Sequence, residues 1–127
     1  MYKLKPNKRV ILISGASSGI GLATSKLLLE EGYLLSLGVR DTEKTKQLLA
    51  KSGTQNYLIN KFEAKDLETS KIWVENTVKK FGKIDGLINN AGILKIVSFD
   101  KGDIEDLNEL WKVNVVAPFN LTKLCLP

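Results

Sequence analysis

A glycine-rich turn near the start of the chain restricts its possible folds more than any other feature. Before the turn, residues 9–14 form an apolar, β-branched run that predicts a strand buried on both faces. The turn itself spans residues 15–21 with the spacing Gly-x-x-x-Gly-x-Gly, and a helical pattern follows it. A strand, a glycine turn and a helix in this order predict the first unit of a parallel α/β sheet.

Strand-length apolar runs and helical patterns alternate along the rest of the chain. Further strands are expected at residues 34–39, 56–60 and 84–89, and helices at residues 42–50, 67–81 and 104–126. The first helix should end at Gly32, and its apolar face is expected to contain Ile20, Ala23, Leu27 and Leu28. Asp41, Asp66 and Asp103 are placed to cap the later helices. The order βαβαβαβα predicts a doubly wound parallel sheet with helices on both faces.

Glycine is needed in the turn for three physical reasons. It allows a tight exit from the strand, a close approach of the backbone to a pyrophosphate, and close packing of helix on strand. The helix N-terminus then offers free N–H groups and a partial positive charge to phosphate groups. No Lys follows the second glycine, which excludes a Gly-x₄-Gly-Lys phosphate loop. The turn predicts a dinucleotide site, with a purely structural turn as the alternative.

Four ordered segments make the chain similar to the short-chain dehydrogenase/reductase family. They are the glycine turn, Phe-Gly-Lys-Ile-Asp at residues 81–85, Asn-Asn-Ala-Gly at residues 89–92, and Val-Asn at residues 113–114. The resemblance implies a Rossmann-type fold with strand order 3-2-1-4 in one domain over residues 1–127, truncated after the fourth βα unit. It also implies hydride transfer between a nicotinamide and a small-molecule carbonyl or alcohol.

The resemblance assigns most of a cofactor site. The implied cofactor-binding residues are Gly15, Ser17, Ser18, Gly19, Ile20, Gly21, Glu63, Asn90, Ala91 and Gly92. Of these, Asn90, Ala91 and Gly92 would line the ribose, and Glu63 stands where the family has an Asp that binds the adenine amine. Asn89 would mainly tie neighbouring strands together.

The end of the second predicted strand indicates which dinucleotide binds. Val39 stands where family members that prefer NAD carry Asp, whose carboxylate would repel a 2′-phosphate. Arg40 can pair with that phosphate through charge-assisted, bidentate hydrogen bonds. The sequence therefore predicts NADP in preference to NAD. Two alternatives stay open: Asp41 could neutralise Arg40, or Arg40 could be an ordinary exposed residue at a helix start.

One catalytic residue of the family can be identified, Asn114. The family uses Ser, Tyr, Lys and Asn, and the Asn holds a water in the proton relay. Pro118, four residues later, has no N–H, and in a helix its ring clashes with the carbonyl of Asn114. That carbonyl is expected to be free to bind the water. The alternative is that Asn114 merely caps a kink.

The catalytic Ser, Tyr and Lys are not expected within this sequence. Tyr57 and Lys61 have the Tyr-x-x-x-Lys spacing, but on a strand this interval spans ~13 Å and the two side chains do not form a pair. They also precede the Asn-Asn-Ala-Gly element, which the family's pair follows. The sequence ends at Pro127, before the fifth strand and its helix. We therefore expect the N-terminal half of an oxidoreductase, inactive by itself, or a non-catalytic nucleotide-binding or interaction module.

The composition limits which metals, nucleic acids and membranes the chain is expected to bind. The single Cys, Cys125, and the absence of His leave no disulfide and no ligand set for a structural zinc site, so no metal is expected. The net charge of +5 comes from lysines spread along the chain, and no nucleic-acid motif is present. The apolar run behind the basic residues 1–9 is too short for a signal peptide or a membrane span. A cytoplasmic protein is expected, forming a homo-oligomer, a dimer or tetramer, when full length.

Overall fold

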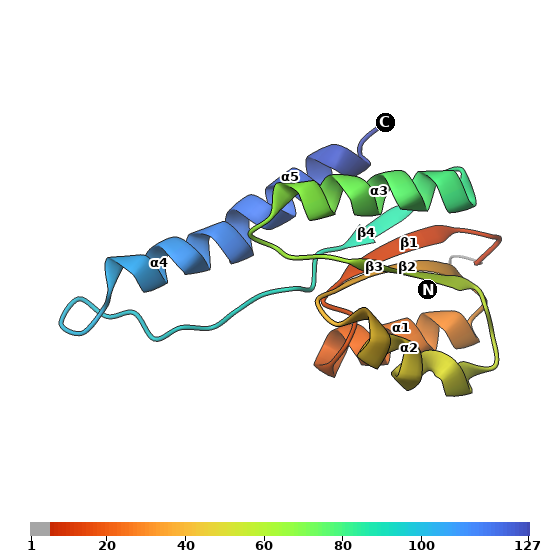
Figure 1. The fold of residues 1–127 in the computed structure, drawn as a ribbon, viewed down its shortest axis with the longest axis horizontal. Coiled ribbons are helices and arrows are strands. Elements are labelled where there is room, and N and C mark those ends of the chain that lie inside the picture. The colour runs from red at the N-terminus through yellow and green to blue at the C-terminus, as the bar shows by residue number, and fades with distance from the viewer. Residues whose placement is uncertain (1–5) are drawn as a thin grey trace, which may run out of the picture.

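Four parallel strands form one sheet in the order β3-β2-β1-β4 in the computed structural model, which describes residues 6–127 (Figure 1). Residues 1–5 of the basic N-terminal segment lie outside the described residues. The strands are β1 (Val10–Ser14), β2 (Leu34–Val39), β3 (Tyr57–Lys61) and β4 (Gly86–Ile88). The predicted fold class and strand order are confirmed.

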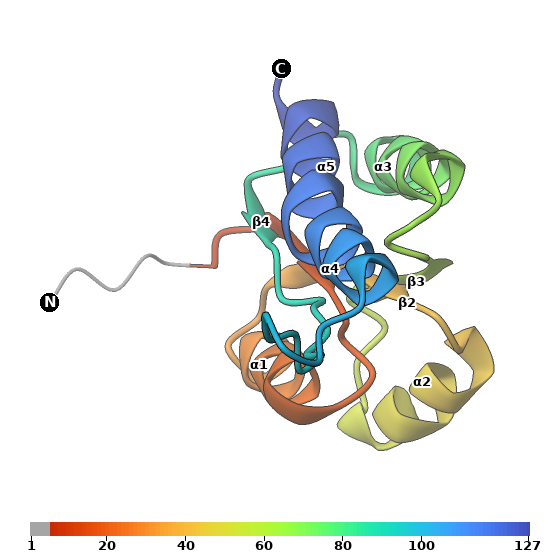
Figure 2. The same ribbon diagram turned by 90° about the vertical axis from the view of Figure 1, so that its left-hand side faces the viewer.

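Helices cover both faces of the sheet (Figures 1 and 2). One face carries α1 (Gly19–Glu30) and α2 (Thr42–Leu49), and the other carries α3 (Leu67–Phe81) and α5 (Ala117–Cys125). A short 3-10 turn, η1 (Ala50–Ser52), follows α2. The helix α4 (Ile104–Trp111) continues through a π-helical segment, η2 (Lys112–Val116), into α5, and this rod extends beyond the sheet (Figure 1). Within residues 6–127, none of the helices has the length and apolar character needed to cross a membrane.

Three helices begin at a capping aspartate, as predicted. The carboxylates of Asp41, Asp66 and Asp103 accept hydrogen bonds from backbone N–H groups in the first turns of α2, α3 and α4, at 2.9, 3.0 and 2.9 Å. Each bond satisfies a donor that the helix itself leaves unpaired. At the other end of α3, Gly82 takes a left-handed conformation with φ of 79° and stops the helix.

The third and fourth strands differ from their predicted ranges. β3 lies one residue later than predicted, and β4 has only three residues where six were expected. Asp85 explains the late start of β4, because its carboxylate, rather than a backbone carbonyl, accepts the N–H of Val10 at 2.8 Å. That hydrogen bond, helped by the ammonium group of Lys83, holds the pKa of Asp85 below its usual value. Tyr57 and Lys61 both lie on β3, so they share no helical face.

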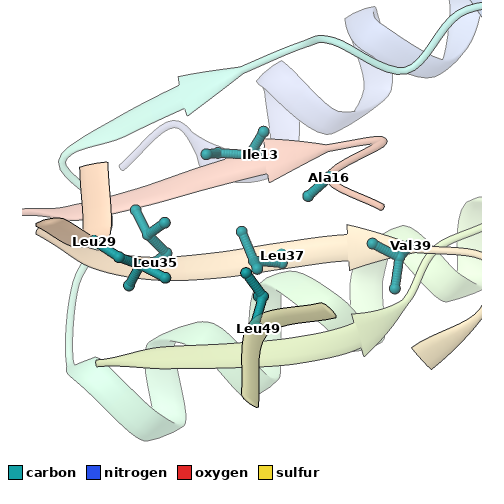
Figure 3. Close-up of a cluster of buried hydrophobic side chains, with 7 residues drawn as sticks. All are labelled: Ile13, Ala16, Leu29, Leu35, Leu37, Val39 and Leu49. Carbon is teal, nitrogen blue, oxygen red and sulfur yellow. The ribbon is translucent and has the colours of Figure 1, made fainter. Parts of the chain in front are cut away.

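The core has one layer on each face of the sheet. Figure 3 shows the layer under α1 and α2, formed by Ile13, Ala16, Leu29, Leu35, Leu37, Val39 and Leu49. The opposite layer consists of Val10, Leu12, Phe62, Trp73, Val74 and Leu121. Strand β1 contributes to both layers, because successive side chains point to opposite faces. This explains why its sequence is continuously apolar.

The predicted apolar face of α1 is wrong for three of its four residues, since only Leu28 packs against the core and Ala23 is exposed. Ile20 and Leu27 are 79% and 57% exposed. The residues of α1 that are buried are Gly21, Ser25 and Leu29. Small residues are required because α1 lies against the glycine turn, and a Cβ at Gly21 would lie 2.4 Å from the carbonyl oxygen of Gly15. Ser25 is tolerated there because its hydroxyl donates to the Gly21 carbonyl at 2.7 Å.

Trp73 sets the distance of α3 from the sheet. Its ring lies directly over Gly38, where a Cβ would come within 2.4 Å of Cζ3. The indole N–H donates to the hydroxyl of Ser36 at 2.9 Å, and the ring contacts Phe62 with a centroid separation of 5.2 Å. Trp73 is fully buried, so its polar atom needs this partner.

We expect Gly38→Ala to lower the free energy of unfolding by about 1–3 kcal/mol, since the rigid indole ring has no room to yield. Urea denaturation followed by circular dichroism measures the change. Gly86→Ala is a matched control in β4, another strand of the same sheet, because its Cβ would meet only the terminal Cδ1 of Ile11, at 2.9 Å. That side chain can rotate away, so the control should change stability by less than about 1 kcal/mol. Equal unfolding midpoints for the two variants would contradict the packing argument.

Candidate functional site

A cleft of about 390 Å³ opens at the carboxyl ends of the strands. Its walls are the glycine turn, the segments after β2 and β3, the segment after β4, and one side of α4 and η2. All the predicted cofactor-binding residues except Gly21 line it. Val39, which the sequence analysis used to choose between the dinucleotides, also lines it. Sequence reasoning missed the other lining residues, which are Gly38, Phe62, Ala64, Lys65, Ile93, Glu109 and Val113. Ligands of doubly wound sheets bind at this edge.

The glycine turn brings backbone to the cleft surface with no side chain in between. Gly15 and Gly19 adopt left-handed conformations with φ of 69° and 50°. A Cβ at Gly15 would lie 3.0 Å from the Cα of Ala91, so the turn also packs tightly against the segment after β4. Gly21 lies beneath the cleft rather than on it, where it allows α1 to approach the turn. Turn geometry and helix packing therefore account for Gly15 and Gly21, and the approach of backbone to a pyrophosphate stays a prediction.

The N-terminus of α1 lacks a capping side chain and a nearby carboxylate. Unlike α2, α3 and α4, it has no side-chain cap: Ser18 stands at the N-cap without a side-chain hydrogen bond, and no acidic residue occupies the first turn. The amino-terminal N–H groups and the positive end of the helix dipole thus face the cleft without a carboxylate to neutralise them. A negatively charged group suits this position better than any other.

Ser14 and Asn90 join the end of β4 to the glycine turn. The hydroxyl oxygen of Ser14 accepts the backbone N–H groups of Asn90 and Ala91, both at 3.0 Å. In return, the side-chain amide of Asn90 donates to the carbonyl oxygens of Ser14 and Gly15, at 3.0 and 3.1 Å. Ser14 was not predicted. A hydroxyl at the last position of an otherwise apolar strand is the signal that could have revealed it.

The role expected for Asn89 belongs to Asn90. Asn89 donates to the hydroxyl of Thr122 in α5, at 3.1 Å, and so contacts a helix rather than a neighbouring strand. Successive residues of an extended segment point in opposite directions, which places Asn90 toward β1 and Asn89 toward α5. The tie between strands is thus made by a residue that also lines the cleft.

Arg40 lies at the edge of the cleft and is exposed. Asp41 does not neutralise it, because one oxygen of its carboxylate accepts the N–H of Lys44, and the ion pairs among residues 6–127 include none between Arg40 and Asp41. The backbone at Arg40 is fixed by Lys61, whose ammonium group donates to the Arg40 carbonyl at 2.6 Å. The guanidinium group is therefore available to an anion at this end of the cleft.

Glu63 lines the cleft just after β3, between Phe62 and Ala64. The segment is attached to the start of α3 by Thr69, whose hydroxyl accepts the N–H of Glu63 at 3.0 Å. The side chain of Glu63 therefore projects from a backbone position that two elements hold.

Asn114 holds the segment after β4 to the rod. Its side-chain Oδ1 accepts a hydrogen bond from the backbone N–H of Ile93 at 2.9 Å. Its Nδ2 donates to the backbone carbonyl of the same residue, also at 2.9 Å. The side chain is thus used structurally and is not among the residues lining the cleft. The kink predicted from Pro118 takes the form of the π-helical segment η2, and Pro118 has no N–H to offer the Asn114 carbonyl.

Cys125 behaves as a small apolar residue. It packs against the core layer under α3 and α5, and burial raises the pKa of its thiol to about 11. A thiol with this pKa stays protonated and unreactive at neutral pH. In the part of the chain that the structure describes, no group of three or more His, Cys, Asp or Glu side chains could hold a metal ion.

Comparison with known proteins gives consistent matches. A family model described as short chain dehydrogenase matches residues 9–127. Agropine synthesis reductase of Rhizobium rhizogenes is 45% identical over 121 residues, which are 93% of this chain but 27% of that protein. The 3-oxoacyl-[acyl-carrier-protein] reductase FabG of Thermotoga maritima is 34% identical over 94% of this chain and 49% of its own length. The solved short-chain dehydrogenase/reductase (glucose/ribitol dehydrogenase) of Brucella melitensis superposes with a TM-score of 0.92 at 28% identity, over 99% of this chain and 54% of that one. The chain thus spans between about a quarter and a half of these relatives.

We expect Ser14→Ala to lower the free energy of unfolding by about 1–3 kcal/mol, because the backbone N–H groups of Asn90 and Ala91 lose their common acceptor. Chemical denaturation measures the change. Ser98→Ala is the matched control: the Ser98 hydroxyl bonds Asp100 at the surface, and its loss should cost less than about 0.5 kcal/mol. A Ser14→Ala variant as stable as the control would refute a structural role for this junction.

Proposed function

Since this chain belongs to the short-chain dehydrogenase family, we propose that it is the NADP(H)-binding portion of an oxidoreductase acting on a small-molecule carbonyl or alcohol. The family uses a nicotinamide cofactor, which supplies or accepts the hydride when bound. One observation carries the proposal: the cleft has an uncapped helix start along one wall and an unpaired guanidinium group at its edge.

The cleft fits a dinucleotide at its centre because the glycine turn leaves room for one. A Cβ at Gly19 would meet nothing within 4 Å, so the turn borders open space there, and the N–H groups at the start of α1 face the same place. We assign the pyrophosphate to this turn, bound by backbone donors of Ser17, Ser18 and Gly19 with Ile20 beside them. Gly21 acts from below, by bringing α1 close.

The two ends of the cleft then receive the two nucleosides. Arg40 would pair with a 2′-phosphate, and Val39 lacks the carboxylate that would repel it. Glu63, beyond it, would accept a hydrogen bond from the adenine amine. At the other end, Asn90, Ala91 and Gly92 border the ribose next to the nicotinamide, held in place by Ser14.

We assign the proton-relay water to the backbone carbonyl of Asn114. Its side chain is engaged by Ile93, which leaves the main chain for this task. Pro118 has no N–H with which to close an α-helical hydrogen bond to this carbonyl. The side chain of Asn114 would then act by holding the segment after β4 in a fixed position against the rod.

An apolar stripe on the rod supports the expected homo-oligomer. Ile104, Leu107, Trp111, Val115 and Phe119 recur at helical spacing and are 62%, 48%, 60%, 42% and 66% exposed. We propose that a second copy of the protein covers this stripe, since large apolar side chains in a continuous row are characteristic of interfaces.

Arg40→Ala should raise the dissociation constant for NADPH roughly ten- to one-hundred-fold while changing that for NADH less than about two-fold, since only NADPH carries the 2′-phosphate. Titration of both nucleotides by calorimetry measures the effect. Lys46→Ala removes a cation from α2 that pairs with Glu43 and does not line the cleft, and it should leave both constants unchanged. Equal affinities of the unaltered protein for NADPH and NADH would disprove the preference.

The 127-residue chain should not oxidise NADPH in the presence of small aldehydes and ketones, because its one Tyr-x-x-x-Lys interval, Tyr57 to Lys61, lies on a strand and not on a helix. The measurement is the NADPH absorbance over time, with a full-length family member as positive control. Turnover that depends on the carbonyl would show that this chain is a complete catalyst and would favour a different proton donor.

A further inference from the structure

One carboxylate, that of Glu109 in α4, links three segments at a wall of the cleft. Its Oε1 lies 2.7 Å from the ammonium nitrogen of Lys65, in the segment between β3 and α3. Its Oε2 lies 2.5 Å from that of Lys95, in the segment between β4 and α4. Lys95 in turn lies 2.6 Å from Asp106, one turn earlier on α4. Figure 1 shows the connection from β4 running beneath α4.

The Lys65–Glu109 pair also separates two hollows of the surface. Both residues line the cleft described above, and both line a second hollow of about 260 Å³ on the outer side, bordered by Lys95, Asp106 and Lys112. The pair is therefore a partition made of two side chains from elements that are 44 residues apart in sequence.

Hydrogen bonds within this cluster favour the charged forms of Glu109 and Lys95. Hydrogen bonds from Lys65 and then Lys95 lower the pKa of Glu109 to about 2. The hydrogen bond from Lys95 to Asp106, followed in size by the one to Glu109, raises the pKa of Lys95 above its usual value. The side chains are 29% to 48% exposed, so salt can reach and screen them.

We infer that Glu109 is a positioning residue for the bound dinucleotide, because it holds the segment of residues 62–65 and the segment after β4 against α4 and so fixes the width of the cleft. The inference rests on the proposed function, which places the adenine beside residues 62–65. A single exposed ion pair contributes little, but a carboxylate that ties two connecting segments to one helix also removes the cost of ordering them on binding. Both NADPH and NADH contain the adenine, so the effect should not discriminate between them.

The test variant is Glu109→Gln, which keeps the shape and removes the charge. We expect the dissociation constants of NADPH and NADH to rise together, by roughly two- to five-fold, with no shift in the global urea midpoint. Hydrogen–deuterium exchange, measured without nucleotide, should become faster in residues 62–66 and 93–102. Unlike Arg40→Ala, this variant should preserve the ratio of the two affinities.

Two further variants make the test specific. Glu43→Gln breaks an exposed ion pair of 2.6 Å on α2, away from the cleft, and should change neither affinity nor exchange in those segments. Lys65→Met should weaken both nucleotides as Glu109→Gln does, and the double variant should be less affected than the product of the two single effects, because the residues act as a pair.

The inference is overturned if Glu109→Gln binds both nucleotides as tightly as the unaltered protein, whether or not exchange changes. It is also overturned if only NADPH binding weakens, which would make Glu109 a contributor to phosphate recognition. If the unaltered protein binds neither nucleotide, the proposed function fails and this inference fails with it. Normal binding by the unaltered protein and by the variant overturns the inference alone.

Discussion

The structure depends on the close approach of the glycine turn to the end of β4. Ser14 and Asn90 exchange hydrogen bonds across this junction, and Gly15 and Gly21 leave the space that makes it possible. The same junction sets where α1 begins, and therefore where its unpaired N–H groups point. A single packing constraint thus shapes the sheet edge and the cleft, and the residues expected to touch the phosphates need no side chains of their own.

Sequence reasoning succeeded where a local signal decides the outcome. Asp41, Asp66 and Asp103 cap helices because a short carboxylate just before a helical run has few better partners than the first free N–H groups. It failed for the buried face of α1, because hydrophobic periodicity counts apolar side chains. Here the helix lies so close to the turn that Gly21 and Ser25 form the contact, and Ile20 remains exposed.

The cleft was predictable in its contiguous motifs and unpredictable on its far wall. The glycine turn and the Asn-Asn-Ala-Gly element can be recognised in the sequence from the spacing and type of their residues. Glu109 and Val113 line the cleft only because of where the rod passes over the carboxyl ends of the strands. The hydrogen bonds between Asn114 and Ile93 fix that position. That position follows from long-range packing and from the π-helical segment, for which a proline in the sequence indicates a kink but not its form.

The two tryptophans lie in opposite environments, which gives the molecule two independent optical signals. Trp73 is fully buried, so its emission should be blue-shifted. It contacts Phe62, which lines the cleft, so the emission of Trp73 should also respond to what occupies the cleft. Trp111 is 60% exposed on the apolar stripe of the rod, so its red-shifted emission should respond to whatever covers that stripe. One fluorescence spectrum should therefore report separately on the contents of the cleft and on the covering of the stripe, without a label.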